Sequence, residues 1–597
     1  MSVSKIVGTK GSDVFDGTGS ALLDLSVRLV RGAAPEDLAE RIKAVASQGV
    51  ADAFVMAFHS RNVRGGKGER DIFQTLYLAL NEVEPYLARN LLDLVPDYGS
   101  WRDVFAMAPL EAEERNLNDL RHGIYRLAAS QLRVDEAMGA GRSISLCAKW
   151  APRESSADVK KAQWLANTLF PEVKPYSAQM KAYRKLVAGL NQRLDTVETH
   201  MCGGSWASIK PQSVPGRAGK LYGRALLNMT STYKGGHRVE LRGAEANALR
   251  FPSREDRMEC RKHFEAHFAA AAAGAKGVKV HGADTLQPHE LVRKAMELMH
   301  SDSSESEKDQ IRAIWRSLVE KVRGQGGLGK SIMMSDFSGS MTSAGAAGDT
   351  PYWVSMALGL LGAECCTDEF KDRFMTFDSN PTWHQLPAEG DLFDRLASIH
   401  RNVSTGFSTD FQKAMDLVLA TLKEKRVRPG EEPENLIVLT DMNWDAACGS
   451  ADTSSYTGNT YRHHVKHTPW ETHVEMIRES FKRAGEDMHG IGWNMPRIVI
   501  WNLAANPTDF HATADTPGVA MLSGWSATQF KVLCDVGPRQ LTPLEILRVE
   551  LDDPQYDRVR YRVAAFFGRG GQKKPYISHA NGFGAEETCS SGCSCEE

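Results

Sequence analysis

Long apolar runs are absent from this chain: no stretch reaches the roughly 18 residues that a membrane-spanning helix needs. The first residues, 1–8, also lack the basic stretch and apolar segment that mark a secretory signal. We therefore expect no spanning segment and predict a cytoplasmic protein.

Cysteine is sparse, with ten residues in a chain of 597, and their spacing does not resemble a disulfide framework. The densest group, Cys589, Cys593 and Cys595, has no fourth ligand nearby, as a structural zinc site would require. We expect reduced cysteines and a flexible, metal-free tail over residues 568–597.

A large excess of either charge is also missing. The 72 Lys and Arg residues are balanced by 75 Asp and Glu residues, which excludes a globally basic nucleic-acid binder. Locally, however, residues 151–262 hold 20 basic residues against 10 acidic ones. Because phosphate contacts supply most non-specific nucleic-acid affinity, this segment is our candidate RNA-binding region, and a merely solvated basic face is the alternative. The residues that we expect to contact phosphate are Lys160, Lys161, Lys181, Arg184, Lys185, Arg217, Lys220 and Arg224. The aromatic residues interleaved with them, which suit stacking on unpaired bases, are Tyr183, Trp206, Tyr222 and Tyr233.

Over residues 20–323, apolar residues mostly recur at the spacing of an amphipathic helix, and the alternating pattern of a strand is scarce. Serial short helices indicate a HEAT-like helical-repeat region. A compact irregular bundle is the alternative, because no clean sequence repeat is present. The predicted helices are 35–45, 51–60, 70–81, 85–94, 118–133, 156–169 and 178–193.

A glycine-rich stretch at 324–329 ends the helical pattern and predicts a domain boundary. Beyond it, apolar strands alternate with helices, which is typical of a parallel sheet in a doubly wound, Rossmann-like α/β domain. We predict strands at 331–335, 372–377, 436–440, 497–502 and 519–522. The chain length favours several domains. Their predicted ranges are 1–19 (flexible N-terminus), 20–323 (helical), 328–535 (α/β), 536–567 (helical extension) and 568–597 (tail).

Oxygen-bearing side chains follow the predicted strands. Asp336-Phe-Ser338-Gly-Ser340 comes directly after the first strand, Asp441 closes the strand at 436–440, and Thr409 lies between them. In open α/β sheets, ligands bind beyond the carboxyl ends of the strands. Hydroxyl and carboxylate oxygens suit Mg²⁺, which prefers octahedral oxygen coordination and retains waters. The sequence therefore predicts a magnesium site.

This three-part pattern resembles the von Willebrand factor A domain with its metal-ion-dependent adhesion site. The resemblance covers about residues 328–535. It implies that Ser338, Ser340 and Thr409 bind the metal directly, while Asp336 and Asp441 act through water. The ion would be Mg²⁺ or another divalent cation such as Mn²⁺ or Ca²⁺, and a carboxylate of a protein partner would complete its shell.

Two segments of the helical region, Arg64-Gly-Gly-Lys-Gly-Glu-Arg70 and Tyr98-Gly-Ser-Trp101, remotely resemble the TROVE module of Ro autoantigen proteins. In that family, a ring of helical repeats joins an A domain in the same order. The resemblance implies binding of structured or single-stranded RNA.

We therefore expect a monomeric, non-enzymatic, Ro-like RNA-binding protein with a Mg²⁺-dependent protein-interaction domain. Such a protein would act in RNA quality control or in a small-RNA ribonucleoprotein. The alternative is a protein-interaction scaffold that uses the metal site without RNA. An enzymatic role is not expected, because the sequence places no His or Lys to activate Ser338 as a nucleophile.

Overall fold

The chain packs as two compact units. The computed structural model describes residues 3–7, 13–109, 115–139, 141–154, 158–234, 237–239, 241, 243–282, 286–342, 349–367, 370–378, 380–402, 410–443, 470–537 and 539–568. The first unit comprises residues 1–84, 97–99 and 195–565, and the second comprises residues 85–96, 100–194 and 566–597. Among the described residues, no helix is both long and apolar enough to cross a membrane.

The second unit is helical in its described part. The longest amphipathic helix, α8, buries Leu120, Ile124, Ala128 and Leu132 along one face, as a four-residue spacing dictates. The helices of the second unit are α5 (Pro85–Asn90), α7 (Trp101–Ala106), α8 (Arg115–Ala137), α9 (Cys147–Trp150), α10 (Val159–Leu169) and α11 (Tyr176–Leu194). A further helix, α6 (Val95–Tyr98), runs from this unit into the first.

The first unit begins with a short antiparallel pair, β1 (Lys5–Val7) and β2 (Asp13–Phe15). We predicted a flexible N-terminus here. Instead, Val14 and Phe15 are buried, and Phe15 pairs with Phe510 through the backbone. The helices that precede the large sheet are α1 (Ala21–Arg28), α2 (Pro35–Gln48), α3 (Val50–Arg61), α4 (Arg70–Val83), α12 (Val197–Gly203), α13 (Gly216–Leu226), α14 (Glu255–Ala272), α15 (Pro288–Met299) and α16 (Glu305–Gly324). A two-stranded ribbon, β3 (Tyr233–Lys234) with β4 (His237–Arg238), also lies in this unit.

A six-stranded sheet forms the α/β part of the first unit. Its spatial order is β10-β9-β8-β5-β6-β7, and all neighbours are parallel except β6 and β7. Renumbered from β5, this is the doubly wound order 3-2-1-4-5-6, whose topological switch point lies between β5 and β8. The strands are β5 (Ser331–Asp336), β6 (Arg373–Phe377), β7 (Trp383–Gln385), β8 (Asn435–Thr440), β9 (Arg497–Asn502) and β10 (Val519–Ser523).

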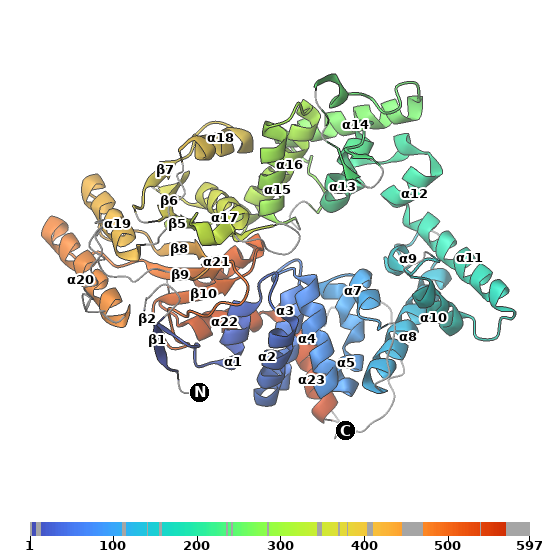
Figure 1. Ribbon diagram of the computed structural model, residues 1–597, viewed down its shortest axis with the longest axis horizontal. Helices are drawn as coiled ribbons and strands as arrows, with labels where there is room; N and C mark the ends of the chain where they lie inside the picture. The colour runs from blue at the N-terminus through green and yellow to red at the C-terminus, as the bar shows by residue number, and fades with distance from the viewer. Residues whose placement is uncertain are drawn as a thin grey trace, which may run out of the picture. The chain divides into compact units, whose positions relative to one another are not determined.

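Helices cover both faces of this sheet. One helix, α17, packs across β5, β6 and β8, while α19 and α20 lie on the opposite side (Figure 1). Both strands at the switch point are buried at every residue, as expected when two helical layers enclose a parallel sheet. The helices of this part are α17 (Pro351–Cys365), α18 (Leu392–Asn402), α19 (Phe411–Lys425), α20 (Trp470–His489), α21 (Phe530–Val536), α22 (Pro543–Leu551) and α23 (Asp557–Gly568).

The approach of α17 to β5 depends on Gly359. A Cβ atom at this position would lie 2.1 Å from Oγ of Ser335, a buried side chain on β5. We expect Gly359→Ala to destabilise the protein by about 1–3 kcal/mol in urea unfolding, because overpacking outweighs the better helix propensity of alanine. The control is Gly324→Ala at the end of α16, where nothing lies within 4 Å of the added atom. Equal stability of the two variants would contradict this prediction.

The N-terminal helices pack at the carboxyl end of β9 and β10. The side chain of Asn502 donates to the carbonyl of Val27 at 2.9 Å, and the Ser523 hydroxyl donates to the carbonyl of Ser26. These bonds join α1 to the sheet within one compact unit. The predicted boundary at 324–329 lies inside that unit, so separate folding of residues 20–323 and 328–535 stays a prediction.

Candidate metal site

Asp336 is the last residue of β5 and is fully buried. One carboxylate oxygen accepts the backbone N–H of Ser338 at 2.8 Å, which turns the chain away from the strand into the short helix η6 (Gly339–Thr342). The hydroxyls of Ser338 and Ser340 then lie 3.1 Å apart. The carboxylate and the two hydroxyls are therefore gathered at the carboxyl end of β5.

The neighbouring strand β8 supplies Thr440 and Asp441 at the same edge. The Thr440 hydroxyl donates to the second carboxylate oxygen of Asp336 at 3.1 Å, and it accepts the N–H of Met442 at 3.1 Å. Asp441 is buried and accepts the N–H of Asn443. Met442 has a φ of 67°, and its carbonyl contacts the buried ring of His511 at 2.9 Å. These bonds fix the turn that holds Asp441 beside the switch point.

The two carboxylates create a local excess of negative charge. Burial, followed by the charge of Asp441, raises the pKa of Asp336 to about 7. In the part of the chain that the structure describes, its hydrogen-bond donors are uncharged and no cation is among the groups that shift its pKa. A buried carboxylate is costly unless a cation or sufficient hydrogen bonds compensate it. The electrostatics of this edge therefore favour a bound cation.

The donor geometry fits a small divalent ion. Adjacent oxygens around an octahedral Mg²⁺ lie about 3 Å apart, and the Ser338 and Ser340 hydroxyls are separated by 3.1 Å. Among the described residues, no three His, Cys, Asp or Glu side chains are grouped to hold a metal ion. The metal ligands proposed for this site need no cluster of three such side chains, because they combine two carboxylates with hydroxyls.

Thr409, the predicted third hydroxyl ligand, lies outside the described residues. The next residue, Asp410, caps α19 and donates its N–H to the carbonyl of Asp378 at 3.3 Å. Asp378 follows β6, the neighbour of β5, so the start of α19 lies at the carboxyl edge of the sheet.

Sequence reasoning missed two polar residues at this edge. Thr440 bonds directly to Asp336, and Asp378 is a buried carboxylate whose pKa is raised by burial. Asp378 was detectable, because it follows an apolar strand as Asp336 does. Thr440 had no comparable signal, since a threonine at the end of a buried strand is an ordinary strand residue.

The eight candidate RNA-binding residues are not on one compact unit. The chain leaves the second unit after Leu194, which assigns Arg217, Lys220 and Arg224 to the first unit. Arg224 is engaged internally with Glu307 and two backbone carbonyls, and Lys220 pairs with Glu290. Internal ion pairs of this kind reduce the charge available for phosphate.

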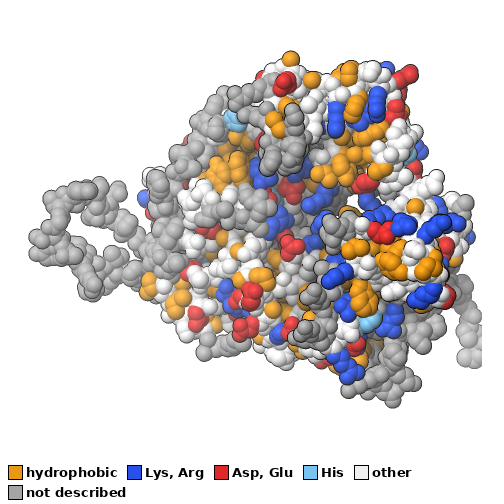
Figure 2. Space-filling view, turned by 45° about the vertical axis from the view of Figure 1, so that its right-hand side comes forward, with side chains coloured by type: hydrophobic (Ala, Val, Ile, Leu, Met, Phe, Trp, Pro, Cys, Tyr) orange, Lys and Arg blue, Asp and Glu red, His pale blue; other side chains and the backbone are white. Residues whose placement is uncertain are grey.

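The other five candidates lie on α10 and α11 of the second unit. Lys160, Lys181, Arg184 and Lys185 are exposed, although Arg184 pairs with Glu154, and the amine of Lys161 donates to the carbonyl of Phe105. On the face shown in Figure 2, basic side chains occur in several groups with acidic and apolar side chains between them.

The aromatic residues interleaved with these cations are engaged in packing. Tyr183 is buried and donates its hydroxyl to the carbonyl of Pro152, and Trp206 is stacked by Arg257, whose guanidinium carbon is 3.5 Å from the ring centroid. Tyr222 is half-buried, and the side chain of Tyr233 lies outside the described part. Neither Tyr183 nor Trp206 presents a free ring for stacking on a base.

Comparison with known proteins gives a family match over the α/β part of the chain. Residues 330–553 match the model of a domain of unknown function, DUF7788. This DUF7788 region contains the whole sheet and both carboxylates of the candidate site. The chain is also similar to the uncharacterized protein L728 of Acanthamoeba polyphaga mimivirus, with 25% identity over 556 residues. That alignment covers 90% of this chain and 85% of the viral protein, so it extends well beyond the DUF7788 region into the helical residues.

Proposed function

We propose that the DUF7788 region is a metal-dependent protein-interaction domain of the von Willebrand factor A type. The observation that carries the proposal is the meeting of two buried carboxylates, Asp336 and Asp441, with two hydroxyls at the switch point of the sheet. The strand order with its single antiparallel edge strand supports the same assignment.

In this proposal, Ser338, Ser340 and Thr409 hold Mg²⁺, or Mn²⁺ or Ca²⁺, directly. Asp336 and Asp441 hold it through water, and Thr440 keeps the carboxylate of Asp336 oriented. The ion supplies a coordination position for a carboxylate oxygen of a partner protein. We expect no enzymatic role, because among the described residues the Ser338 hydroxyl is paired with the Ser340 hydroxyl and with no general base.

Affinity purification of the tagged full chain tests this function. Proteins that depend on the site should copurify in Mg²⁺, be released by EDTA, and be absent from the Asp336→Ala variant. Recovery of the same partners with EDTA and with Asp336→Ala would contradict metal-dependent recruitment.

RNA binding is a second candidate, supported by the exposed cations of α10 and α11 in a helical unit. In this second proposal, HEAT-like helical repeats bind RNA, as the Ro-like interpretation implies. The residues expected to contact the RNA are now Lys160, Lys181, Arg184 and Lys185. Without RNA, the protein would be the scaffold described above.

Charge reversal distinguishes these two outcomes. We expect Lys181→Glu with Lys185→Glu to weaken retention of single-stranded RNA about tenfold at low salt, and to lower the slope of log affinity against log salt by about 1.4, because two phosphate contacts are lost. The control is Lys423→Glu with Lys425→Glu, an equal charge change on exposed positions of α19. Filter-binding assays over a salt series measure both quantities. Equal retention by the two double variants would exclude α11 as the RNA site.

A further inference from the structure

The two edges of the six-stranded sheet differ in how they are covered. At one edge, α1 and α22 pack against β10, and the buried amine of Lys67 bonds to its last residue, Ser523. At the other edge, β7 ends the sheet, and no described strand pairs with its outer side. Proteins commonly cover or otherwise block their sheet edges, so an open edge strand is a surface on which another chain can pair.

The backbone of β7 offers hydrogen-bonding groups on this outer side. The carbonyl of Thr382 accepts the N–H of Thr376 in β6, and the N–H of Leu386 donates to the carbonyl of Asp372, the residue before β6. The register pairs His384 with Phe374. In an antiparallel ladder, alternate residues face the partner strand. The N–H and C=O groups of Trp383 and Gln385 therefore point away from β6. Two residues with this orientation supply two donors and two acceptors to an added strand.

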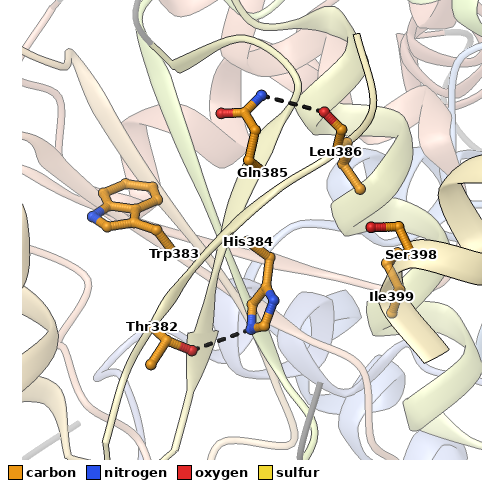
Figure 3. A pocket seen from close by; sticks show the side chains of 7 residues that line it. All are labelled: Thr382, Trp383, His384, Gln385, Leu386, Ser398 and Ile399. Atoms are coloured by element: carbon orange, nitrogen blue, oxygen red, sulfur yellow. Dashed lines mark hydrogen bonds between the residues drawn. The ribbon is translucent and has the colours of Figure 1, made fainter. Parts of the chain in front are cut away.

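A pocket of about 300 Å³ lies beside this edge strand. It is lined by residues 382–386 and by Ser398 and Ile399 of α18, and Figure 3 shows Ser398 and Ile399 facing the strand from the helix. The ring of His384 stacks on Phe374 and contacts the Thr382 hydroxyl at 3.1 Å. A side chain of an added strand can enter this space, since alternate side chains of a strand point to the same face.

The lining favours an uncharged, hydrogen-bonding side chain. Burial lowers the pKa of His384, which disfavours a cationic ring that could pair with an acidic residue. The nearby carboxylate of Asp378 also opposes negative charge. The polar groups that remain are the Ser398 and Thr382 hydroxyls and the imidazole.

We propose that the outer edge of β7 binds an extended peptide segment of a partner protein as an additional strand, with one uncharged polar side chain in the pocket between β7 and α18. This mode of recognition takes affinity from backbone hydrogen bonds and specificity from the pocket. A second copy of this chain is the poorer occupant. Two strands of three residues would share few backbone hydrogen bonds. The site lies on the edge strand and does not depend on the metal.

Selection from a phage-displayed library of random dodecapeptides, performed on the full chain in EDTA, tests this inference. Peptides bound at the edge should lose at least tenfold in affinity for Gln385→Pro, which removes an outward N–H without removing a backbone bond to β6. The side-chain bond from Gln385 to the Asp372 carbonyl is lost in this variant and in its control alike. Gln385→Ala keeps the N–H and is the matched control. Hydrogen exchange should show that the amides of Trp383 and Gln385 become protected when the peptide binds.

Three outcomes would overturn the proposal. Selected peptides that bind Gln385→Pro as tightly as wild type would place their site elsewhere. Unchanged exchange at residues 383 and 385 would exclude an added strand. A wild-type dimer that Gln385→Pro converts to a monomer would identify a second copy as the occupant. Because Asp336→Ala should leave peptide binding unchanged, failure of this proposal and failure of the metal site are distinguishable.

Discussion

In EDTA, the Asp336→Asn variant should be at least as stable as the wild type, whereas in millimolar Mg²⁺ the wild type should be the more stable protein. The amide keeps the size of the side chain and can still accept the N–H of Ser338, while its NH2 group would donate to the Thr440 oxygen in place of accepting from it. It removes a buried charge next to Asp441. Without a cation, that charge is disfavoured by burial and by its neighbour. With Mg²⁺ at a hundred times its dissociation constant, the wild type should gain about 2.7 kcal/mol that the variant lacks.

Urea unfolding with and without Mg²⁺ measures this reversal, and titration calorimetry measures the metal affinity directly. Ser338→Ala should also lose metal affinity, but it should gain no stability in EDTA because it removes no charge. Asp416→Asn, an exposed carboxylate of α19, is the control for the loss of one negative charge. If the wild type gains no stability and gives no binding heat with Mg²⁺, Mn²⁺ or Ca²⁺, the metal site is excluded.

The strands of the sheet were predictable because they are buried along their length. Predicted strands at 331–335, 436–440 and 497–502 differ from β5, β8 and β9 by at most one residue at either end. Placing Asp336 and Asp441 at one edge then required only the rule that parallel strands end together. The sequence did not reveal β7, because three residues are too few to show an alternating pattern.

The basic segment shows where linear reasoning fails. A count of charges over residues 151–262 treats neighbours in sequence as neighbours in space, but the chain changes compact units after Leu194. Arg224 is also neutralised by Glu307, a residue 83 positions later. No local pattern could have shown that pairing, because it arises from the packing of α13 against α16.

The loop at 65–68 provides a second example. On sequence alone, a cation in a glycine-rich loop such as Lys67 would be interpreted as a residue that contacts phosphate. In the structure, Lys67 is 1% exposed, and its amine donates to the Ser523 carbonyl at 2.9 Å and to the Ser523 hydroxyl at 2.7 Å. The phosphate interpretation of Lys67 is therefore wrong. The loop joins the N-terminal helices to the end of β10 and is closed by a bond from Thr528 to Gly66.

Lys67 should make folding stability rise with pH in the alkaline range. Burial lowers its pKa from 10.5 to about 8 in the folded protein, while the unfolded chain retains the ordinary value. Below pH 8 both states are protonated, and the folded state bears the full cost of the buried charge. Between pH 8 and 10.5 only the unfolded state keeps the proton, so this cost is progressively removed as pH rises. The complete change is about 3 kcal/mol, since one pKa unit corresponds to about 1.4 kcal/mol.

The contribution of Lys67 to the pH dependence is isolated by subtracting the free energy of unfolding of Lys67→Met from that of the wild type at each pH. Other groups titrate in both proteins alike, so their effects cancel. This difference in the free energy of unfolding, wild type minus variant, should increase from pH 8 to 10.5 and stay constant between pH 6 and 7. Arg64→Met, which removes an exposed cation next to this loop, should give a flat difference throughout, since arginine stays protonated. A flat profile for Lys67→Met would mean that the amine is not desolvated, and the junction between this loop and β10 would then have to be open to water.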